Sequence, residues 1–518
     1  MRFFDLLDYH ARERPDAVFA EFEDQTTSYA EAAARTRRIG NGLCELGLAI
    51  GDRVGLLAKN RLDYALFYYA AARAGVVPVP LNYRLAPPEL AYILDDARTR
   101  ALFATPDLAA NIAPVRGELS RVEHWFAMGG EADGWESYED WAGAQSDGPV
   151  DREIDDEFDL YQMYTSGTTG RPKGAVIQHR AVSANIQQIQ LGMNLRAGDT
   201  TLIVAPLYHA AAGIVTFAST AAGGSLLIHE DFAPHAAVDA MSQQAVTHAL
   251  LVPAMLQACL VGVPDVAERS YDALRSIVYG ASPIAAETLR QGLEVFGCEF
   301  MQGYGMTETT AVLTNLLAAD HVRALRDRPD LLLSAGRAVL GTEVRIVDES
   351  DQPLPNGEVG EIVARGPQLM RCYWNRAEAS KEALRGGWMH TGDAGVLDDD
   401  GYLFIQDRVK DMIVSGGENI YPREVEDALY AHPAVAEAAV IGIPDEQWGE
   451  AVKAVVVLKA GATATADELI DFCRGRLAGY KRPRSVDWSD ELPRNPSGKV
   501  LKRELRDPYW AGHDRRVS

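Results

Sequence analysis

Residues 164–174 combine the side chains that proteins use to hold phosphate groups. The segment reads YTSGTTGRPKG and connects two apolar runs, DLYQM and AVIQH, which we predict to be buried strands. Glycines in such a connection let backbone N–H groups approach an anion, and hydroxyls and a lysine complete the contacts. The segment therefore predicts a phosphate-binding loop. An ordinary polar surface turn, which uses the same residue types, is the alternative.

The loop differs from the phosphate loop of kinases and GTPases. That motif requires G-x-x-x-x-G-K followed by Ser or Thr. Here the spacing from Gly167 to Gly170 is too short, and Lys173 is followed by Gly174. We therefore expect phosphate chemistry of another kind.

Further motifs follow the loop in order along the chain. They are YGASP at 279–283, QGYGMTE at 302–308, TGD at 391–393, DRVKDMIVSGGENIYP at 407–422 and PRNPSGKV at 493–500. Together these segments resemble the adenylate-forming superfamily of acyl-CoA synthetases, peptide-synthetase adenylation domains and beetle luciferases. The resemblance extends from the N-terminal strands to about Leu501 and is strongest to the fatty-acyl and aryl-CoA ligases.

This resemblance implies an enzyme, an AMP-forming acid–thiol ligase. The family uses ATP to convert a carboxylate into an acyl-adenylate, releases pyrophosphate, and passes the acyl group to a thiol. A carboxylate is already ionised at neutral pH, so the first step needs charge stabilisation at the α-phosphorus and no general base. The implied cofactors and co-substrates are ATP, Mg²⁺ and coenzyme A.

At the reacting phosphates the resemblance implies a catalytic set. Lys173 would hold the departing pyrophosphate, and Thr307 would contact the α-phosphate. Glu308 would orient Mg²⁺, and Lys499 would bridge the carboxylate and the α-phosphate. His209 completes the set as a gate or a substrate-positioning residue. The alternatives are a solvated carboxylate for Glu308, an exposed loop lysine for Lys499 and a satisfied core histidine for His209.

Around the base and the sugar the resemblance assigns further contacts. Tyr304 would stack on adenine, and Gly280 and Ala281 would line the purine. Asp393 and Arg408 would bind the ribose hydroxyls, although an aspartate in TGD is also a common turn former. The whole set assigned to ATP and AMP is Thr165, Ser166, Gly167, Thr168, Thr169, Gly170, Lys173, Gly280, Ala281, Ser282, Gln302, Gly303, Tyr304, Gly305, Met306, Thr307, Asp393, Arg408 and Lys499.

The acyl pocket is expected beside His209, where the chain continues with Ala210, Ala211, Ala212 and Gly213. Relatives that activate amino acids place an acidic residue near here to pair the substrate amine, and this segment has none. The small side chains leave volume, which favours an apolar acid that is bulky, long-chain or aryl. The set assigned to the pocket is His209, Ala210, Ala211, Gly213, Gly280, Gly305 and Met306.

Coenzyme A is the expected acceptor, because only 19 residues follow Lys499 and a fused carrier domain does not fit. Family members rotate a small C-terminal domain between the two half-reactions, and Lys410 is the matching hinge. The residues assigned to coenzyme A are Gly416, Gly417, Trp448, Tyr480, Arg482 and Arg84. A Gly-Gly β-turn and a solvated basic helix end are the alternatives for the glycines and for residues 480–484.

The elements that must position these residues alternate between strand and helix patterns. Such alternation around residues 53–107 and 202–302 predicts parallel sheets with helices on both faces. Residues 336–406 change to short strands with turn signals, which indicates a β-rich subdomain. We expect an α/β fold, with a large N-terminal domain of doubly wound sheets at residues 1–409 and a small mobile α+β C-terminal domain at 410–518.

Composition limits the partners and the compartment. The 518 residues carry a formal net charge of -24, which disfavours nucleic acid and anionic membranes as main partners. Residues 200–229 contain no Asp, Glu, Lys or Arg, but prolines and glycines interrupt them, and they are better explained as strand, buried helix and strand than as a membrane span. Single, scattered cysteines and an N-terminus without a long apolar core favour the cytoplasm.

Three functions remain open from the sequence: an acyl-CoA synthetase, a stand-alone adenylating enzyme that hands its acyl group to a carrier protein or partner enzyme, and a non-catalytic ATP-binding protein. Loss of Lys173, Glu308 or Lys499 would have supported the third, and all three are present. The identity of the acid and a homodimeric state are left open.

Overall fold

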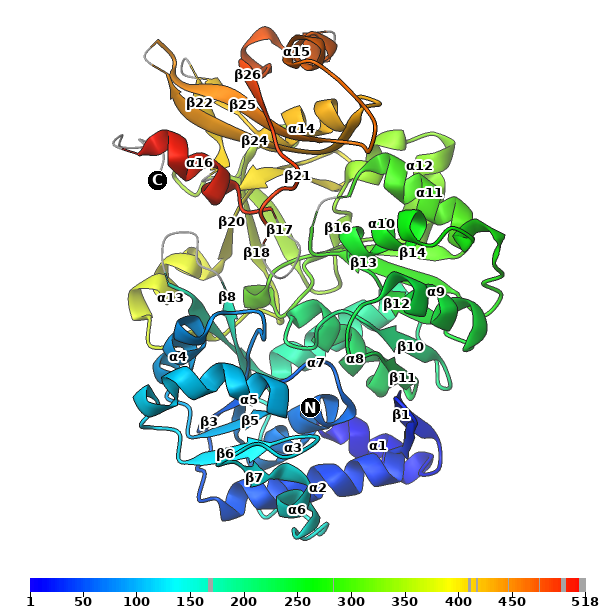
Figure 1. Ribbon diagram of the computed structural model, residues 1–518, viewed down its shortest axis with the longest axis vertical. Helices are drawn as coiled ribbons and strands as arrows, with labels where there is room; N and C mark the ends of the chain where they lie inside the picture. The colour runs from blue at the N-terminus through cyan, green and yellow to red at the C-terminus, as the bar shows by residue number, and fades with distance from the viewer. Residues whose placement is uncertain are drawn as a thin grey trace.

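The chain is an α/β protein in which the C-terminal elements lie above two larger sheets (Figure 1). The computed structural model describes residues 1–165, 171–282, 284–408, 411–415, 418–445, 447–474, 476–494 and 500–511, with residues 407, 408, 418 and 419 described by their backbone alone. Across these ranges the strands form five sheets. The predicted fold class, mixed α/β with a small C-terminal unit, is confirmed.

The first large sheet is entirely parallel. Its order is β4(Val77–Pro80), β3(Arg53–Leu57), β5(Ala101–Ala104), β6(His124–Ala127) and β7(Glu136–Ser137). Its central strands β3 and β5 are buried at every position, as expected where helices cover both faces. The accompanying helices are α3(Leu62–Ala74), α4(Pro87–Asp96), α5(Pro106–Ile112), η1(Ala113–Glu118) and α6(Tyr138–Gly143).

The second large sheet has nine strands and draws on distant parts of the sequence. Its order is β16(Arg337–Ala338), β15(Thr314–Leu316), β14(Glu299–Tyr304), β13(Ser276–Gly280), β12(His248–Leu250), β10(Thr200–Ile203), β11(Ser225–Ile228), β1(Val18–Phe22) and β2(Gln25–Ser28). The N-terminal hairpin joins it through β1, which pairs in parallel with β11 so that Ala20 faces Leu226. The helices of this part are α1(Asp5–Glu13), α7(His179–Met193), α8(Ala210–Ala222), α9(Pro234–Gln243), α10(Pro253–Gly262), η2(Val266–Glu268), α11(Ala286–Phe296) and α12(Ala318–Arg326).

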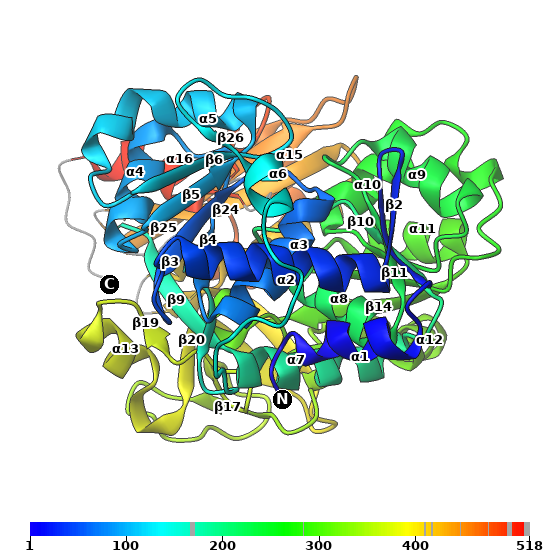
Figure 2. The same cartoon turned by 90° about the horizontal axis from the view of Figure 1, so that it is seen from below.

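Helices fill the space between the two large sheets. Seen from below in Figure 2, α2(Tyr29–Glu45) and α3 cross between the sheets, and α8 lies on the side of the nine-stranded sheet. Helix α2 begins at Ser28, whose hydroxyl accepts the N–H of Glu31 while the Glu31 side chain accepts the Ser28 N–H. Helix α3 is buried along its whole length and ends at Gly75 in the left-handed conformation. The same apolar cluster includes residues of α2, α3 and α8, so the two sheets share one core.

The uncharged segment at residues 200–229 is folded into the nine-stranded sheet. It supplies strand β10, helix α8 and strand β11, which is the arrangement expected from its prolines and glycines. Among the helices that the structure describes, none combines the length and the apolar character that a membrane crossing requires.

Two smaller sheets lie between the large sheets and the C-terminal elements. The first joins β8(Asp159–Thr165), β9(Lys173–Gln178) and β19(Cys372–Tyr373). The second is antiparallel, in the order β17(Glu343–Val347), β18(Gly360–Arg365), β20(Met389–Leu397) and β21(Leu403–Arg408). Short helices accompany them: η3(Thr307–Thr309), η4(Pro329–Leu333), α13(Ala377–Ala383) and η5(Arg385–Gly387).

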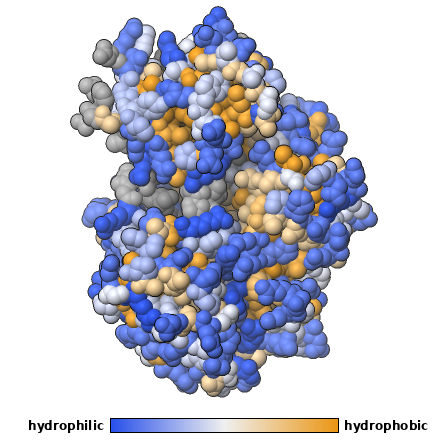
Figure 3. All heavy atoms as spheres, viewed as in Figure 1, coloured by the Kyte–Doolittle hydropathy of each residue, from blue (hydrophilic) through white to orange (hydrophobic). Residues whose placement is uncertain are grey.

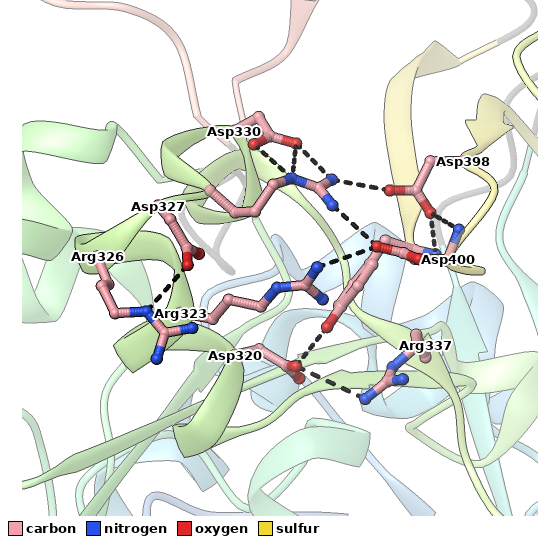
Figure 4. Close-up of polar contacts among 10 residues, drawn as sticks. Asp320, Arg323, Arg326, Asp327, Asp330, Arg337, Asp398 and Asp400 are labelled. Carbon is pink, nitrogen blue, oxygen red and sulfur yellow. Dashed lines mark hydrogen bonds and ion pairs between the residues drawn. The ribbon is translucent and has the colours of Figure 1, made fainter.

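A network of arginines and aspartates joins the β20–β21 turn to α12 and η4 (Figure 4). Arg328 contacts Asp398 at 3.0 Å and Asp400 at 2.9 Å, and Arg323 contacts Asp400 at 3.2 Å. The buried Tyr402 donates a hydrogen bond of 2.5 Å to Asp320 on α12. Individual exposed ion pairs stabilise little, but several that share partners fix a geometry. The network therefore sets the direction of β21, whose far end leads to the predicted hinge.

The C-terminal part has a sheet of its own. Its order is β23(Glu418–Ile420), β22(Ile413–Ser415), β25(Gly449–Leu458) and β24(Val435–Asp445), and β26(Ser485–Trp488) pairs in parallel with β25. The helices are α14(Pro422–Tyr430), α15(Ala466–Arg474), η7(Gly479–Lys481) and α16(Lys502–Trp510). From α14, Arg423 donates a 3.4 Å hydrogen bond to the carbonyl of Ile284, just beyond β13. This contact connects the C-terminal part to the nine-stranded sheet.

Candidate active site

A buried carboxylate lies where the three-stranded sheet meets the end of β14. Glu308, in η3, has 3% of its surface exposed. Thr165 Oγ1 donates to its Oε1 at 3.0 Å, and the Tyr373 hydroxyl donates to the same oxygen at 2.8 Å. The backbone is fixed too, because Met370 N donates to the Glu308 carbonyl at 2.7 Å. Burial excludes the solvated carboxylate that was the alternative for Glu308.

Lys173 lies in the same cluster. It begins β9 directly opposite Thr165 on β8, and its Nζ is 5.2 Å from the centre of the Tyr373 ring. Tyr373 stays beside this strand because β19 pairs with β9, with Tyr373 facing Ala175. The structure thus brings together Thr165, Lys173 and Glu308, three of the residues predicted at the phosphates. The other residues predicted in this loop, Ser166, Gly167, Thr168, Thr169 and Gly170, lie outside the described residues.

The predicted purine wall is a place where backbones approach closely. Gly280 and Gly303 face each other on β13 and β14, and a Cβ at Gly280 would lie 2.1 Å from the Gly303 carbonyl oxygen. Gly280 has φ of +155° and Ala281 has φ of +63°, so the chain bends sharply where β13 ends. A Cβ at Gly305 would lie 2.1 Å from the Ala311 carbonyl oxygen. Larger side chains at these glycines would displace backbone.

The neighbouring residues predicted for the nucleotide follow along the same two strands. Ser282 comes two residues after β13 and is partly exposed. Gln302 lies on β14, and its side-chain Oε1 is buried with no hydrogen-bond partner among the described residues. Met306 N donates to Thr309 Oγ1 at 3.0 Å, and Thr307 begins η3. Met306 and Thr307 directly precede Glu308 in the chain.

Tyr304 and Asp393 are joined directly, although 89 residues separate them. The Tyr304 hydroxyl donates to Asp393 Oδ2 at 2.8 Å, and Asp393 has 7% of its surface exposed. Asp393 lies on β20 opposite Arg408 on β21, so the backbone register brings the two predicted ribose residues side by side. The side chain of Arg408 lies outside the described residues.

His209 begins a different environment, made of aromatic rings and small side chains. It is the residue before α8, and its ring lies 4.3 Å from that of Tyr208. Burial lowers the pKa of His209 to about 4, and the positive charge of Arg84 adds to this effect. Its Nε2 is buried without a hydrogen-bond partner among the described residues. At neutral pH this histidine is uncharged.

The same row of rings reaches Arg84, which was predicted to contact coenzyme A. Tyr208 packs edge-on against Tyr83 at 5.5 Å between ring centres. The guanidinium of Arg84 lies 5.4 Å from the Tyr83 ring and donates to its hydroxyl at 3.4 Å. The predicted gate and the predicted nucleotide contact of coenzyme A therefore belong to one group of rings.

The residues predicted for the acyl pocket lie beside His209. Ala210 and Ala211 form the first turn of α8 and are partly exposed, as is Met306. All three pack against the main apolar cluster. A Cβ at Gly213 would meet only the Phe217 ring, at 3.5 Å. This wall is apolar, and a methyl group at Gly213 would make only ordinary contact with the Phe217 ring.

The C-terminal residues predicted for coenzyme A are partly described. Trp448 is 41% exposed and Tyr480 is 39% exposed, which suits binding of a ligand from outside. Arg482 Nε is buried with no hydrogen-bond partner among the described residues. Figure 3 shows the surface hollowed between the upper, C-terminal elements and the lower part of the molecule. Gly416 and Gly417, the hinge Lys410, and Lys499 lie outside the described residues.

Sequence reasoning missed two residues that the structure places in this site. Tyr373 contacts both Glu308 and Lys173, yet in the sequence it is an aromatic residue in the unremarked segment RCYWN. Glu361, in GEIVARG, accepts the N–H of Gly392 next to Asp393 at 3.0 Å. The only signal for either was its position within the predicted β-rich segment 336–406, which carries no chemistry.

Comparisons with known proteins show what the chain is similar to. The family profile described as AMP-binding enzyme matches residues 7–374, and the profile of the AMP-binding enzyme C-terminal domain matches residues 424–499. A feruloyl-CoA synthase of Amycolatopsis sp is 41% identical over 96% of each chain. A fatty acid–[acyl-carrier-protein] ligase of Streptomyces coeruleorubidus is 38% identical over 98% of this chain and 97% of that protein. The crystal structure of ATP-bound MatB from Rhodopseudomonas palustris superposes with a TM-score of 0.90 at 31% identity, over 99% of both chains.

Proposed function

The chain belongs to the AMP-binding enzyme family and is an AMP-forming acid–thiol ligase; from that premise we propose the acid, the acceptor and the roles of its residues. The acid is apolar and bulky, either aryl or long-chain. It is activated as an acyl-adenylate with release of pyrophosphate, and the acyl group then passes to coenzyme A.

The observation that carries this proposal is the Glu308 cluster. Two hydroxyls donate to one carboxylate oxygen, and the lysine of the phosphate loop lies beside the same tyrosine ring. A fixed, buried carboxylate is the hard oxygen ligand that Mg²⁺ prefers. When bound, Mg²⁺ neutralises negative charge on the phosphates. Thr165 and Tyr373 would keep the Glu308 carboxylate in one orientation throughout.

The remaining residues divide the work of adenylation. Lys173 would hold the leaving pyrophosphate, and Thr307 would contact the α-phosphate. Lys499 would place its charge between the attacking carboxylate and the α-phosphate, where negative charge develops. No group in this step needs to accept a proton, because the acid enters ionised.

Nucleotide binding would follow the contacts around β13, β14 and β20. The close-packed glycines, Gly280 and Gly303, would let the purine lie against backbone. Tyr304 would present its ring to adenine while its hydroxyl holds Asp393. Asp393 and Arg408 would then bind the ribose.

The acyl group would lie against the first turn of α8. Ala210, Ala211 and Gly213 give an apolar wall without a charge, so an amino acid would find no partner for its ammonium. The likeness to a feruloyl-CoA synthase supports an aryl acid, and the likeness to a fatty acid ligase supports a long chain.

The thiol would reach the acyl-adenylate past His209. Because burial lowers the pKa of His209 to about 4, the imidazole binds a proton weakly, and we assign it positioning of the acyl group or gating of the thiol. Before this step the C-terminal domain would turn about Lys410 and bring Gly416 and Gly417 beside the pantetheine. Coenzyme A would then contact Arg84, Trp448, Tyr480 and Arg482. Such an enzyme would work in the cytoplasm, where both co-substrates are present.

A carrier protein is the second candidate acceptor. The fatty acid–[acyl-carrier-protein] ligase matches almost the whole chain, so the same fold accommodates that function. In that case the thiol arrives on a folded partner, and a basic docking surface would replace the nucleotide contact at Arg84.

One screen tests the acid and the acceptor in sequence. Pyrophosphate release is measured with aryl acids, hydroxylated cinnamic acids, long-chain acids and amino acids; we expect activity with aryl acids, including the cinnamic acids, or with long-chain acids, and none with amino acids. AMP release is then measured with coenzyme A or with phosphopantetheinylated carrier protein. Failure of every acid to release pyrophosphate would overturn the proposed function, and acceleration by carrier protein alone would select the second acceptor.

A further inference from the structure

Strand β20 leaves its regular pairing just where Asp393 faces the nucleotide site. Glu361 on β18 pairs with Ala394, and Val363 pairs with His390, so Ile362 alone stands opposite the segment Thr391, Gly392 and Asp393. Extra residues on one strand form a bulge, which re-aims the side chains that it carries. Here the bulge turns the Asp393 carboxylate toward the Tyr304 hydroxyl, 2.8 Å away.

The bulge is held by side chains in place of the missing ladder hydrogen bonds. The Thr391 hydroxyl donates to the Ile362 carbonyl at 2.7 Å and accepts the Asp393 N–H at 3.1 Å. Gly392 has φ of +69°, and its N–H donates to Glu361 Oε1 at 3.0 Å. Glu361 therefore holds the residue immediately before Asp393, from the neighbouring strand.

The other oxygen of Glu361 fixes the carboxylate itself. Its Oε2 is 2.9 Å from His390 Nδ1 and 3.3 Å from Arg385 Nη2. Arg385 also contacts both oxygens of Asp351 at 3.0 Å. Ligand atoms of Asp351, Glu361 and His390 lie within 4.8 Å of one another, but the guanidinium already provides the positive charge in this cluster. The arrangement orients a carboxylate and is not that of an open metal site.

We propose that Glu361 is a positioning residue for ribose recognition: by accepting the Gly392 N–H it sets the direction of the Asp393 carboxylate toward the ribose hydroxyls. This inference rests on the proposed function, because it takes Asp393 to bind the ribose. Glu361 itself touches neither substrate nor reacting atoms.

The test is the preference for ATP over 2′-deoxyATP and 3′-deoxyATP, measured as the ratio of kcat/KM in pyrophosphate release. Calorimetric binding of AMP and its deoxy forms gives a second readout that does not depend on turnover. A hydrogen bond to a charged group predicts a ratio on the order of tenfold to a hundredfold in the unmodified enzyme. In Glu361→Ala we expect the ratio to fall close to one, with KM for the acid unchanged.

Three further variants make the result specific. Asp393→Asn tests the ribose assignment itself. Glu361→Gln keeps an oxygen that can accept the Gly392 N–H and should retain most of the preference. Asp351→Asn removes a charge from the same cluster without touching the bulge, and should leave the ratio unchanged.

The outcomes separate the inference from the function on which it rests. If Asp393→Asn leaves the ratio unchanged, the ribose assignment fails and the role of Glu361 fails with it. If Asp393→Asn removes the preference and Glu361→Ala keeps it, the inference alone is overturned. A uniform loss of activity with all nucleotides in Glu361→Ala means a merely structural role and also overturns it. If Glu361→Ala does not fold, Glu361→Asp takes its place. The shorter carboxylate stays beside Arg385 but no longer reaches the Gly392 N–H, so we expect the same loss of preference for ATP over the deoxy nucleotides.

Discussion

The nucleotide half and the acyl half of the site are built on opposite principles. In the nucleotide half, Glu308 and Asp393 are almost fully buried and each accepts hydrogen bonds at fixed positions. In the acyl half, rings and small side chains surround His209 Nε2 and the Tyr208 hydroxyl, two buried polar atoms without hydrogen-bond partners among the described residues. The nucleotide half holds carboxylates in fixed positions, and the acyl half surrounds an uncharged histidine with rings and small side chains.

This difference indicates which substitutions should abolish the reaction and which should alter the choice of acid. Charged groups held in a preorganised geometry stabilise a transition state only in that geometry, so substitutions there should remove the reaction. An apolar wall selects by volume, so substitutions there should change which acid reacts while the chemistry remains. Five predictions follow, from the largest expected effect to the smallest.

Lys499→Ala should have the largest effect and should act on one half-reaction only. Loss of one charge stabiliser at the reacting phosphate should slow acyl-adenylate formation by about a thousandfold, or about 4 kcal/mol. Supplied acyl-adenylate and coenzyme A should still give thioester at a near-normal rate. Pyrophosphate release and thioester formation are measured separately, with the exposed Lys459→Ala as the control.

Gly417→Leu should affect the other half-reaction, thioester formation. A branched side chain beside the predicted pantetheine path should block thioester formation and leave adenylation intact. If both variants slow both half-reactions equally while remaining folded, the two halves are not separable and domain rotation about Lys410 does not operate.

Glu308→Gln should slow adenylation by about a hundredfold, or about 2.7 kcal/mol, because the amide keeps the shape and loses the charge. The concentration of Mg²⁺ needed for half-maximal rate should rise in parallel. Glu299→Gln, at the exposed far end of β14, is the matched control and should behave as the unmodified enzyme. An unchanged Mg²⁺ requirement in Glu308→Gln would remove this carboxylate from the metal site.

The neutral His209 predicts an acid-dependent loss of stability of up to about 2 kcal/mol by pH 5. Burial lowers its pKa to about 4 from the ordinary 6.5, so below pH 6.5 the unfolded chain binds a proton that the folded site refuses. Stability therefore falls as the pH drops from about 6.5 toward 4, and His209→Gln should lose less over that window. The measurement is the free energy of unfolding of both proteins at several pH values.

His179 serves as the internal control for that experiment. Its pKa is also lowered to about 4 by burial, and it accepts the Phe3 N–H at 3.0 Å in both proteins. The difference between the two curves then reports His209 alone. Parallel curves would mean that the acyl half does not keep this histidine uncharged.

Ala211→Trp should have the smallest effect and should change selectivity more than rate. Filling the first turn of α8 should lower the preference for a large acid over a short one by about tenfold, or about 1.4 kcal/mol. The measurement is the ratio of kcat/KM for a hydroxycinnamic or long-chain acid against a short acid. An unchanged ratio would place the pocket wall elsewhere and remove the volume argument for this half.

The sequence predicted best those features whose cause is local. Apolar strands between helix patterns indicated parallel sheets because strands covered on both faces show no alternation, and β3 and β5 confirm this. Residues 200–229 were assigned to a strand, a helix and a strand because their prolines and glycines exclude one long helix, and β10, α8 and β11 confirm that assignment. The phosphate loop, predicted from contiguous hydroxyls, glycines and a lysine, stays a prediction, because the structure leaves residues 166–170 undescribed.

Features made by distant contacts could not be read in the same way. Tyr373 reaches Glu308 only because a two-residue strand pairs with β9, and nothing in RCYWN encodes that partner. Nothing in GEIVARG marks Glu361, since its contact with Gly392 depends on a bulge in another strand. Tyr304 and Asp393 are 89 residues apart, and Asp393 lies inside the predicted β-rich subdomain, so their hydrogen bond could only come from the fold.

The pairing of β1 with β11 also orders events during synthesis of the chain. Ala20 must wait for Leu226, about 200 residues later, which at roughly 5 to 20 residues per second takes about 10 to 40 s. The five-stranded sheet has all its strands once residue 137 has been made, well before that partner exists. An unpaired strand edge is a template for pairing with other chains. The N-terminal hairpin is therefore a segment of the nascent protein that ribosome-bound chaperones have reason to hold.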